Sequence, residues 1–188
     1  MRKKTKNKKG FSIAEVMISS FVLVVGLTAI ISLLIENIKQ SVDIRSSIIS
    51  SQLAQEGVEL VRNIRDNNLV NEDAFLNNLP DSDEDDCIID AIYGLNKGNG
   101  PEACGSYDTK LYMNNSLGFY GHSGSAFSGF RRKIIFSDFE DSSGDGNVDN
   151  FSIASMVVWD INASSFPDLS DCNSGNKCTY VKDLLTDH

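Results

Sequence analysis

The distribution of apolar and polar positions separates the N-terminal part of the chain from the rest. Residues 11–35 are predominantly apolar and contain one charged residue, Glu15. This segment is long enough to cross a bilayer core of about 30 Å as a helix that rises about 1.5 Å per residue. A lone carboxylate in such a span costs about 2.5–3.5 kcal/mol near the bilayer centre, so Glu15 requires a partner.

Apolar positions continue at helical spacing after the apolar segment. They are Ile38, Val42, Ile49, Leu53, Leu60 and Ile64. No proline occurs between residues 11 and 79, so we predict one helix over residues 12–66, ended by the polar triplet at 66–68. Its second half, residues 36–68, is expected to bury the apolar stripe against a sheet. Gly57 is expected to bend the helix, or to weaken it by about 1 kcal/mol relative to alanine.

The following region, residues 69–129, is rich in turn-forming residues. We expect short strands at residues 87–91, 111–113 and 118–120. An acidic turn at residues 81–86 precedes the first of them, and glycine-rich loops occupy residues 94–105 and 121–129.

The last region, residues 130–188, alternates apolar and polar positions in the manner of β-strands. We predict strands at residues 130–136, 151–161 and 178–185, with an acidic, glycine-containing turn at residues 138–150. A long helix followed by consecutive strands predicts an α+β fold, in which the helix packs on a C-terminal antiparallel β-sheet.

The charge balance bears on which partners the chain can bind. The sequence has 17 basic and 26 acidic residues, a net charge of −9, and six of the basic residues lie within residues 1–10. Without that segment 11 basic residues remain against 26 acidic ones, a net charge of −15. Such a surface repels phosphate, so we expect no nucleic-acid partner.

No catalytic motif stands out in the chain. The segment Gly121-His122-Ser123-Gly124 has the wrong order for a nucleophile elbow, and phosphate loops and zinc-binding helices are absent from the sequence. We therefore expect a protein that is not an enzyme and has no cofactor.

The four cysteines, Cys87, Cys104, Cys172 and Cys178, all lie beyond the apolar segment. An even number of cysteines on the far side of a membrane indicates disulfides, and four cysteines allow three pairings. We favour Cys87–Cys104 with Cys172–Cys178, because each bond closes a local polar loop. A zinc site is the alternative, but the gaps of 16 and five residues exceed the usual spacing of ligand pairs.

The turn from Asp141 to Asp149 carries oxygen side chains at alternate positions and has Gly146 where a calcium loop turns sharply. Ser152 stands where the bidentate glutamate of such a loop belongs. Aspartate and glycine also suit a plain hairpin turn, so we place no metal ligand here.

The N-terminus resembles the signal of type IV prepilins and pseudopilins. In that family a basic leader ends in glycine, a phenylalanine follows, and a glutamate lies four residues further on. Gly10, Phe11 and Glu15 occupy these positions. The resemblance implies cleavage between Gly10 and Phe11 by a prepilin peptidase and N-methylation of Phe11. It also implies an assembly role for Glu15, through pairing with the α-amino group of Phe11 on a neighbouring subunit.

Later segments resemble PilV-like minor pilins. They are LAQEGVELVRNIRDNN at residues 53–68, an F-x-R-x-I strand at 130–134, a V-x-W strand at 157–159 and a closing L-T-D. His188 stands where that family often has an aromatic residue. The resemblance implies a type IV pilin fold.

The segments divide the chain into five parts. These are a leader at 1–10, a transmembrane and assembly half-helix at 11–35, an amphipathic half-helix at 36–68, a variable loop-rich region at 69–129 and a β-sheet region at 130–188.

The expected function is that of a minor pilin or pilin-like structural subunit of a type IV pilus. Its expected partners are other pilin subunits, a prepilin peptidase, the pilus assembly platform and the membrane. It would lie first in the cytoplasmic membrane with its C-terminal domain outside, and later in a surface pilus. The alternatives are a type II secretion or competence pseudopilin and, from another class, a membrane-anchored binding module or enzyme.

Overall fold

The computed structural model describes residues 10, 12–89, 109–114, 118–122, 124, 126–159 and 165–187. One long helix, α1 (Ile13–Val70), precedes all the strands. The chain divides into two compact units, Met1–Ile44 and Arg45–His188. The first unit contains the apolar part of α1, and the second contains the rest of α1 and the sheet.

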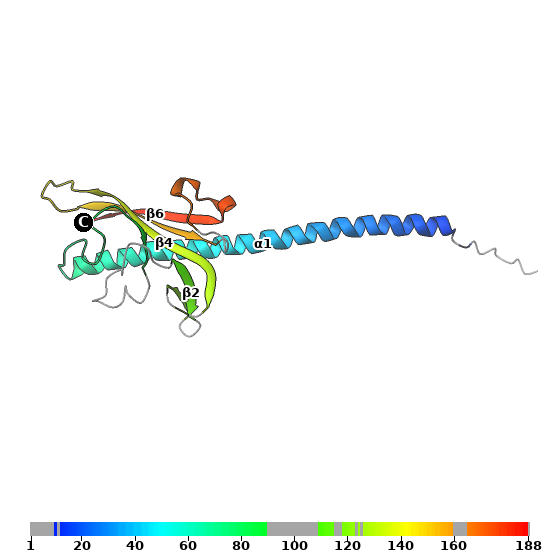
Figure 1. Ribbon diagram of the computed structural model, residues 1–188, viewed down its shortest axis with the longest axis horizontal. Coiled ribbons are helices and arrows are strands. Elements are labelled where there is room, and N and C mark those ends of the chain that lie inside the picture. The colour runs from blue at the N-terminus through cyan, green and yellow to red at the C-terminus, as the bar shows by residue number, and fades with distance from the viewer. Residues whose placement is uncertain are drawn as a thin grey trace, which may run out of the picture. The chain divides into compact units, whose positions relative to one another are not determined.

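The sheet is antiparallel, and its strands follow one another along the second unit. They are β1 (Glu84–Cys87), β2 (Lys110–Asn114), β3 (Phe119–Gly121), β4 (Phe127–Glu140), β5 (Asn150–Val158) and β6 (Cys178–Thr186). The spatial order is β3-β2-β4-β5-β6, and β1 pairs with β4. Figure 1 shows the second half of α1 lying along this sheet, so the predicted α+β fold is confirmed.

Three strand predictions need correction at their ends. The strand predicted at 151–161 occupies Asn150–Val158, and residues 160 and 161 lie outside the described residues. The strand predicted at 130–136 extends over Phe127–Glu140, because β2 and β5 pair with different parts of it. The strand predicted at 87–91 instead occupies Glu84–Cys87 and pairs with β4. Part of the expected acidic turn at 81–86 is therefore strand, since pairing with β4 outweighs the low strand preference of acidic residues.

The predicted helix end is also wrong, since α1 continues to Val70. The expected stop at 66–68 fails because the asparagine side chains are satisfied inside the helix. Asn67 Nδ2 donates to Asn63 Oδ1 at 2.9 Å. Asn68 is buried and donates to the carbonyl oxygens of Phe75 at 3.1 Å and Asn77 at 2.7 Å. Asn68 therefore joins the helix to the turn that follows it.

The helix face that packs on the sheet combines small and large apolar residues. The buried positions of α1 are Ser50, Leu53, Ala54, Gly57, Val58, Val61, Ile64 and Asn68. Leu53 and Ile64 lie on the predicted stripe, and Leu60 is only partly buried at its edge. Gly57, which has no side chain, lies where the backbone of the helix approaches the sheet closely.

Every residue of β5 after Asn150 is buried. Both faces of this strand are therefore covered, whereas many antiparallel strands expose one face to water. On the helix side, Phe151 and Ile153 join the core with Phe136 of β4. On the opposite side, Met156 and Val158 pack against residues of the segment 165–178. That segment therefore serves as a second cover over this end of the sheet.

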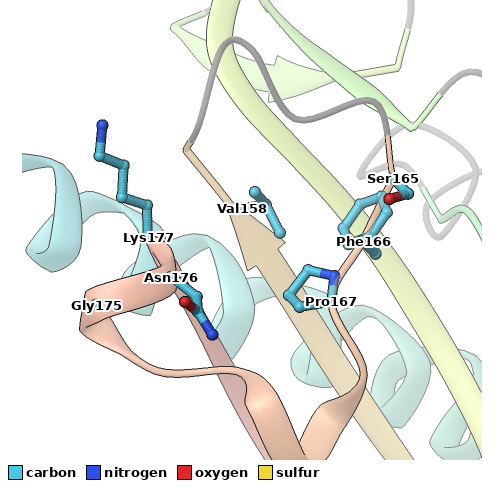
Figure 2. A pocket seen from close by; sticks show the side chains of 7 residues that line it. All are labelled: Val158, Ser165, Phe166, Pro167, Gly175, Asn176 and Lys177. Carbon is cyan, nitrogen blue, oxygen red and sulfur yellow. The ribbon is translucent and has the colours of Figure 1, made fainter.

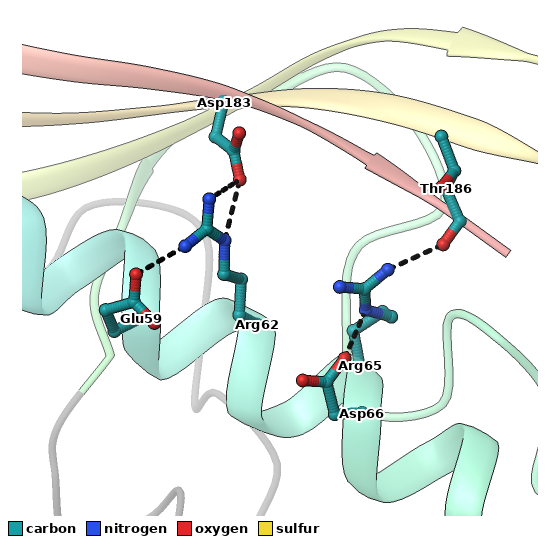
Figure 3. A network of polar contacts seen from close by, with 6 residues as sticks. All are labelled: Glu59, Arg62, Arg65, Asp66, Asp183 and Thr186. Carbon is teal, nitrogen blue, oxygen red and sulfur yellow. Dashed lines mark hydrogen bonds and ion pairs between the residues drawn. The ribbon is translucent and has the colours of Figure 1, made fainter. Parts of the chain in front are cut away.

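Two arginines attach the end of α1 to the edge strand β6 (Figure 3). Arg62 binds Asp183 Oδ2 through Nε at 2.9 Å and Nη2 at 2.8 Å, and it also pairs with Glu59. Arg65 Nη1 donates to the carbonyl oxygen of Thr186 at 2.7 Å. These contacts are partly exposed, so each ion pair contributes only about 0–1 kcal/mol, and their main effect is to fix position.

Arg132 of β4 is the largest fully buried side chain among the described residues, and it points to the helix side of the sheet. Its Nη1 donates to the carbonyl oxygen of Leu53 in α1 at 3.2 Å, and its Nη2 donates to that of Ile89 at 2.8 Å. Glu56 Oε1 lies 3.5 Å from Nη1. A single guanidinium therefore holds α1, β4 and the segment after β1 together.

Candidate functional site

The first unit presents an apolar helix surface. Within the described residues, α1 contains one segment long and apolar enough to cross a membrane, and none of that segment is buried. Its exposed large side chains include Ile13, Val16, Met17, Ile18, Phe21, Val22, Leu23, Val24, Val25, Leu27, Ile30, Ile31, Leu33, Leu34 and Ile35. A contiguous apolar surface of this size is stable only in lipid or against other apolar helices.

The polar side chains of this segment fall into two groups. Ser19, Ser20, Thr28 and Ser32 each donate to a carbonyl oxygen three or four residues earlier, at 2.7–3.0 Å. Their hydroxyl protons are therefore satisfied within the helix, as an apolar environment requires. Glu15 is exposed in the first helical turn and carries the segment's one charge.

The predicted cleavage junction lies just before the helix. Gly10 is exposed, and a Cβ added to it would meet no atom within 4 Å. The fold of this chain therefore does not require a glycine at that position. Phe11, the predicted site of cleavage and N-methylation, lies outside the described residues.

The cysteines form disulfides rather than a metal site in the described part of the chain. Cys172 and Cys178 are bonded to each other, which confirms this predicted pair. Cys87 is also disulfide-bonded. Its predicted partner Cys104 lies outside the described residues, so the pairing Cys87–Cys104 remains a prediction. Bonded cysteines do not offer the thiolates that the alternative zinc site needs.

The turn from Asp141 to Asp149 joins β4 to β5, and its carboxylates bind their own backbone. Asp141 accepts hydrogen bonds from Gly144 N at 2.6 Å and Gly146 N at 2.9 Å. Asp149 accepts one from Ser143 N at 2.6 Å. The described residues contain no group of three or more His, Cys, Asp or Glu side chains that could hold a metal. These bonds favour the hairpin-turn interpretation over a calcium loop.

This turn gives a prediction about pH. The backbone N–H of Gly146, followed by that of Gly144, holds the pKa of the Asp141 carboxyl below its ordinary value. Because the folded pKa is lowered, the stabilisation is complete above the unfolded pKa of about 4 and disappears as the pH falls through the folded pKa. We expect the amide resonances of Gly144 and Gly146 to titrate with a midpoint below 4 in an NMR pH series.

The control for this titration is Asp141→Asn, which should abolish the shared transition of the two glycine amides. A midpoint at or above the ordinary aspartate value would contradict the bonding described for the turn.

A cavity of about 350 Å³ lies beyond the end of β5 (Figure 2). Its lining residues are Val158, Ser165, Phe166, Pro167, Gly175, Asn176 and Lys177. The Phe166 ring also lies beneath the charged groups of Arg131 and Lys133, at 5.3 and 5.2 Å from its centroid. Among the described lining residues, Lys177 is the one with an ionisable side chain.

The structure leaves the predicted site residues in separate places. Gly10 lies just before α1 and Glu15 lies in its first turn, whereas the disulfide and the acidic turn belong to the second unit. His122, whose segment has the wrong order for a nucleophile elbow, directly follows β3. Sequence reasoning did not assign a role to Arg132, although the F-x-R-x-I segment contains it, because charged residues are seldom fully buried.

Comparisons with protein-family models, with curated proteins and with solved structures find no match for this chain. The architecture is that of a long N-terminal apolar helix packed on a C-terminal antiparallel sheet that carries a disulfide, as in pilin-like proteins. A functional assignment therefore depends on the residues of this chain.

Proposed function

We propose that the chain is a minor pilin or pilin-like structural subunit, made as a prepilin and assembled through the first part of α1. The observation that carries the proposal is the exposed apolar segment of α1, which has one carboxylate, Glu15, in its first turn. The basic leader and the Gly10-Phe11 junction immediately precede that segment.

The energetics of Glu15 support assembly in contact with other copies. An isolated carboxylate in a bilayer costs about 2.5–3.5 kcal/mol at the helix centre. The hydroxyl groups of the segment add no comparable cost, since each is bonded within the helix. A free α-amino group created at Phe11 of a neighbouring subunit would offset the cost of Glu15 and set the axial offset between subunits.

The proposal includes the partners and the location. The subunit would stay in the cytoplasmic membrane with the second unit outside, where the Cys172–Cys178 disulfide is stable. A prepilin peptidase, the assembly platform and other pilin subunits would be its partners. We assign it no catalytic activity and no nucleic-acid partner. The chain would resemble PilV-like minor pilins most, and a secretion or competence pseudopilus would use the same features.

Co-expression with a prepilin peptidase and an assembly system tests this function. We expect the native chain to lose residues 1–10, seen by intact mass, and to appear in sheared filaments. Gly10→Val should prevent cleavage, because the peptidase needs a small residue before the scissile bond. Glu15→Ala should permit membrane insertion but prevent incorporation, because the pairing carboxylate is missing.

Matched controls separate these effects from a general loss of the protein. Gly26→Ala adds a Cβ that meets no atom within 4 Å in the same helix, so it should be processed normally. Glu36→Ala removes the next carboxylate, which lies after the apolar segment. Normal processing and incorporation of both Gly10→Val and Glu15→Ala would falsify the pilin proposal and favour a membrane-anchored binding module.

A further inference from the structure

Strand β6 is the last strand in the order β3-β2-β4-β5-β6, so only one of its sides is paired within the sheet. Its register with β5 runs from Asn150 opposite Thr186 to Val158 opposite Cys178. Two hydrogen bonds just beyond the strand ends continue this register, and they show which opposite residues of β5 and β6 are hydrogen-bonded to each other. Trp159 N donates to Lys177 O at 3.0 Å, and Asp187 N donates to Asp149 O at 2.9 Å.

In an antiparallel ladder, bonded pairs alternate with non-bonded pairs. The odd-numbered residues of β6 therefore direct their N–H and C=O groups to β5, and the even-numbered residues direct theirs away from the sheet. The odd-numbered side chains face the helix, as the ion pair of Asp183 with Arg62 shows. The even-numbered side chains of Tyr180, Lys182 and Leu184 lie on the opposite face.

Both ends of this outer edge are already occupied. Cys178 N donates to the carbonyl oxygen of Asn173 at 3.1 Å, and the carbonyl oxygen of Thr186 accepts from Arg65 at 2.7 Å. Between these ends, no hydrogen bond from a described residue reaches the backbone of Tyr180, Lys182 or Leu184. The open edge of β6 therefore consists of these three residues.

The side chains beside the open edge do not protect it. Tyr180 is 43% exposed and Leu184 is 57% exposed, and both are large and partly apolar. Lys182 stands between them, and natural edges often use lysine to repel a further strand. Here Lys182 Nζ binds Asp138 Oδ2 of β4 at 3.2 Å, which leaves the backbone of Lys182 accessible, and its side chain is 53% exposed, so its charge still acts on a strand placed beside it.

We propose that the open edge of β6 binds an extended segment of another protein, which adds to the sheet as a further strand. The backbone groups of Tyr180, Lys182 and Leu184 would pair with those of the segment, and their side chains would select its sequence. Apolar residues suit the positions opposite Tyr180 and Leu184, and an acidic residue suits the position opposite Lys182. The inference concerns the second unit alone and does not depend on the proposed pilin function.

Charge decides between this partner and a second copy of the same strand. An antiparallel pair of β6 strands that uses all three open residues places Tyr180 opposite Leu184 and Lys182 opposite Lys182. Like charges directly opposite each other destabilise a strand pair. Registers shifted by one pair would use Cys178 or Thr186, whose outward groups are already bonded.

Hydrogen exchange of the full chain in detergent micelles tests the proposal, with the capped peptide TVTETVT as the probe and TVTKTVT as its charge-reversed control. We expect TVTETVT at saturation to slow exchange of the amides of Tyr180, Lys182 and Leu184 by about tenfold or more. The affinity for TVTETVT should exceed that for TVTKTVT by about fivefold, the effect of one cross-strand charge pair.

Two variants of Lys182 make the outcome specific. Lys182→Glu should reverse the preference, so that TVTKTVT binds more tightly. Lys182→Pro removes one outward N–H at a position where an edge strand tolerates proline, and it should lose binding that Lys182→Ala retains. Fluorescence of the buried Trp159 reports whether each variant is folded.

Several results would overturn the proposal. They are the absence of amide protection with either peptide, equal affinity for both peptides in the native chain, and an unchanged preference in Lys182→Glu. Protection that grows with protein concentration and needs no peptide would show that a second copy occupies the edge, contrary to the charge argument.

Discussion

Arg132→Ala should destabilise the second unit by about 2–5 kcal/mol, because it empties the space of a large buried side chain and removes two buried hydrogen bonds. The guanidinium is fully buried and bonds the carbonyl oxygens of Leu53 and Ile89, which belong to different parts of the chain. Its loss leaves those two acceptors without these bonds and leaves a cavity between α1 and β4. Urea unfolding of the full chain in detergent micelles measures the change, with Trp159 fluorescence as the signal.

Two controls separate the buried bonds from charge in general. Lys133→Ala removes the neighbouring cation, which lies on the other face of β4 over Phe166, and should cost about 1 kcal/mol or less. Glu56→Gln keeps the size of a partner that is partly exposed and 3.5 Å from Arg132, and its effect should also be about 1 kcal/mol or less. If Arg132→Ala costs no more than Lys133→Ala, Arg132 does not hold the elements together.

The sequence predicted those features that depend on local patterns. The long helix, the strand at 178–185 and the disulfide Cys172–Cys178 each follow from residues that are near one another in the chain. The roles of Gly10 and Glu15 remain predictions from the sequence, and Glu15 stands out there because an acid in an apolar span is unusual.

The sequence did not predict features that depend on pairing between distant segments. The strand at Glu84–Cys87 has an acidic sequence, and only its pairing with β4 makes it a strand. Asn68 was expected to end the helix, but the carbonyl oxygens of Phe75 and Asn77 satisfy its side chain there. The open edge of β6 follows from the spatial order of the strands, which periodicity does not contain.

Gly57 is another residue whose role depends on distant contacts. The sequence suggested that it would bend or weaken the helix, yet α1 continues through it. A Cβ at this position would overlap Ser155 Oγ of β5, and it would lie 3.0 Å from Ile134 Cδ1 and 3.1 Å from Ser155 Cβ. Glycine is therefore required here by the close approach of helix and sheet.

Gly57→Ala should consequently destabilise the second unit by about 1–2 kcal/mol, although alanine favours a helix by about 1 kcal/mol.

Ser155 Oγ is buried and has no hydrogen-bond partner among the described residues, so Ser155→Ala alone should be close to neutral. In the double variant the overlapping oxygen is absent, and the cost of Gly57→Ala should fall by about 1 kcal/mol or more. Gly26→Ala, which meets no atom, should leave the unfolding of this unit unchanged. Additive effects of the two substitutions in a double-mutant cycle would show that the contact between Gly57 and Ser155 does not limit the packing of α1 on the sheet.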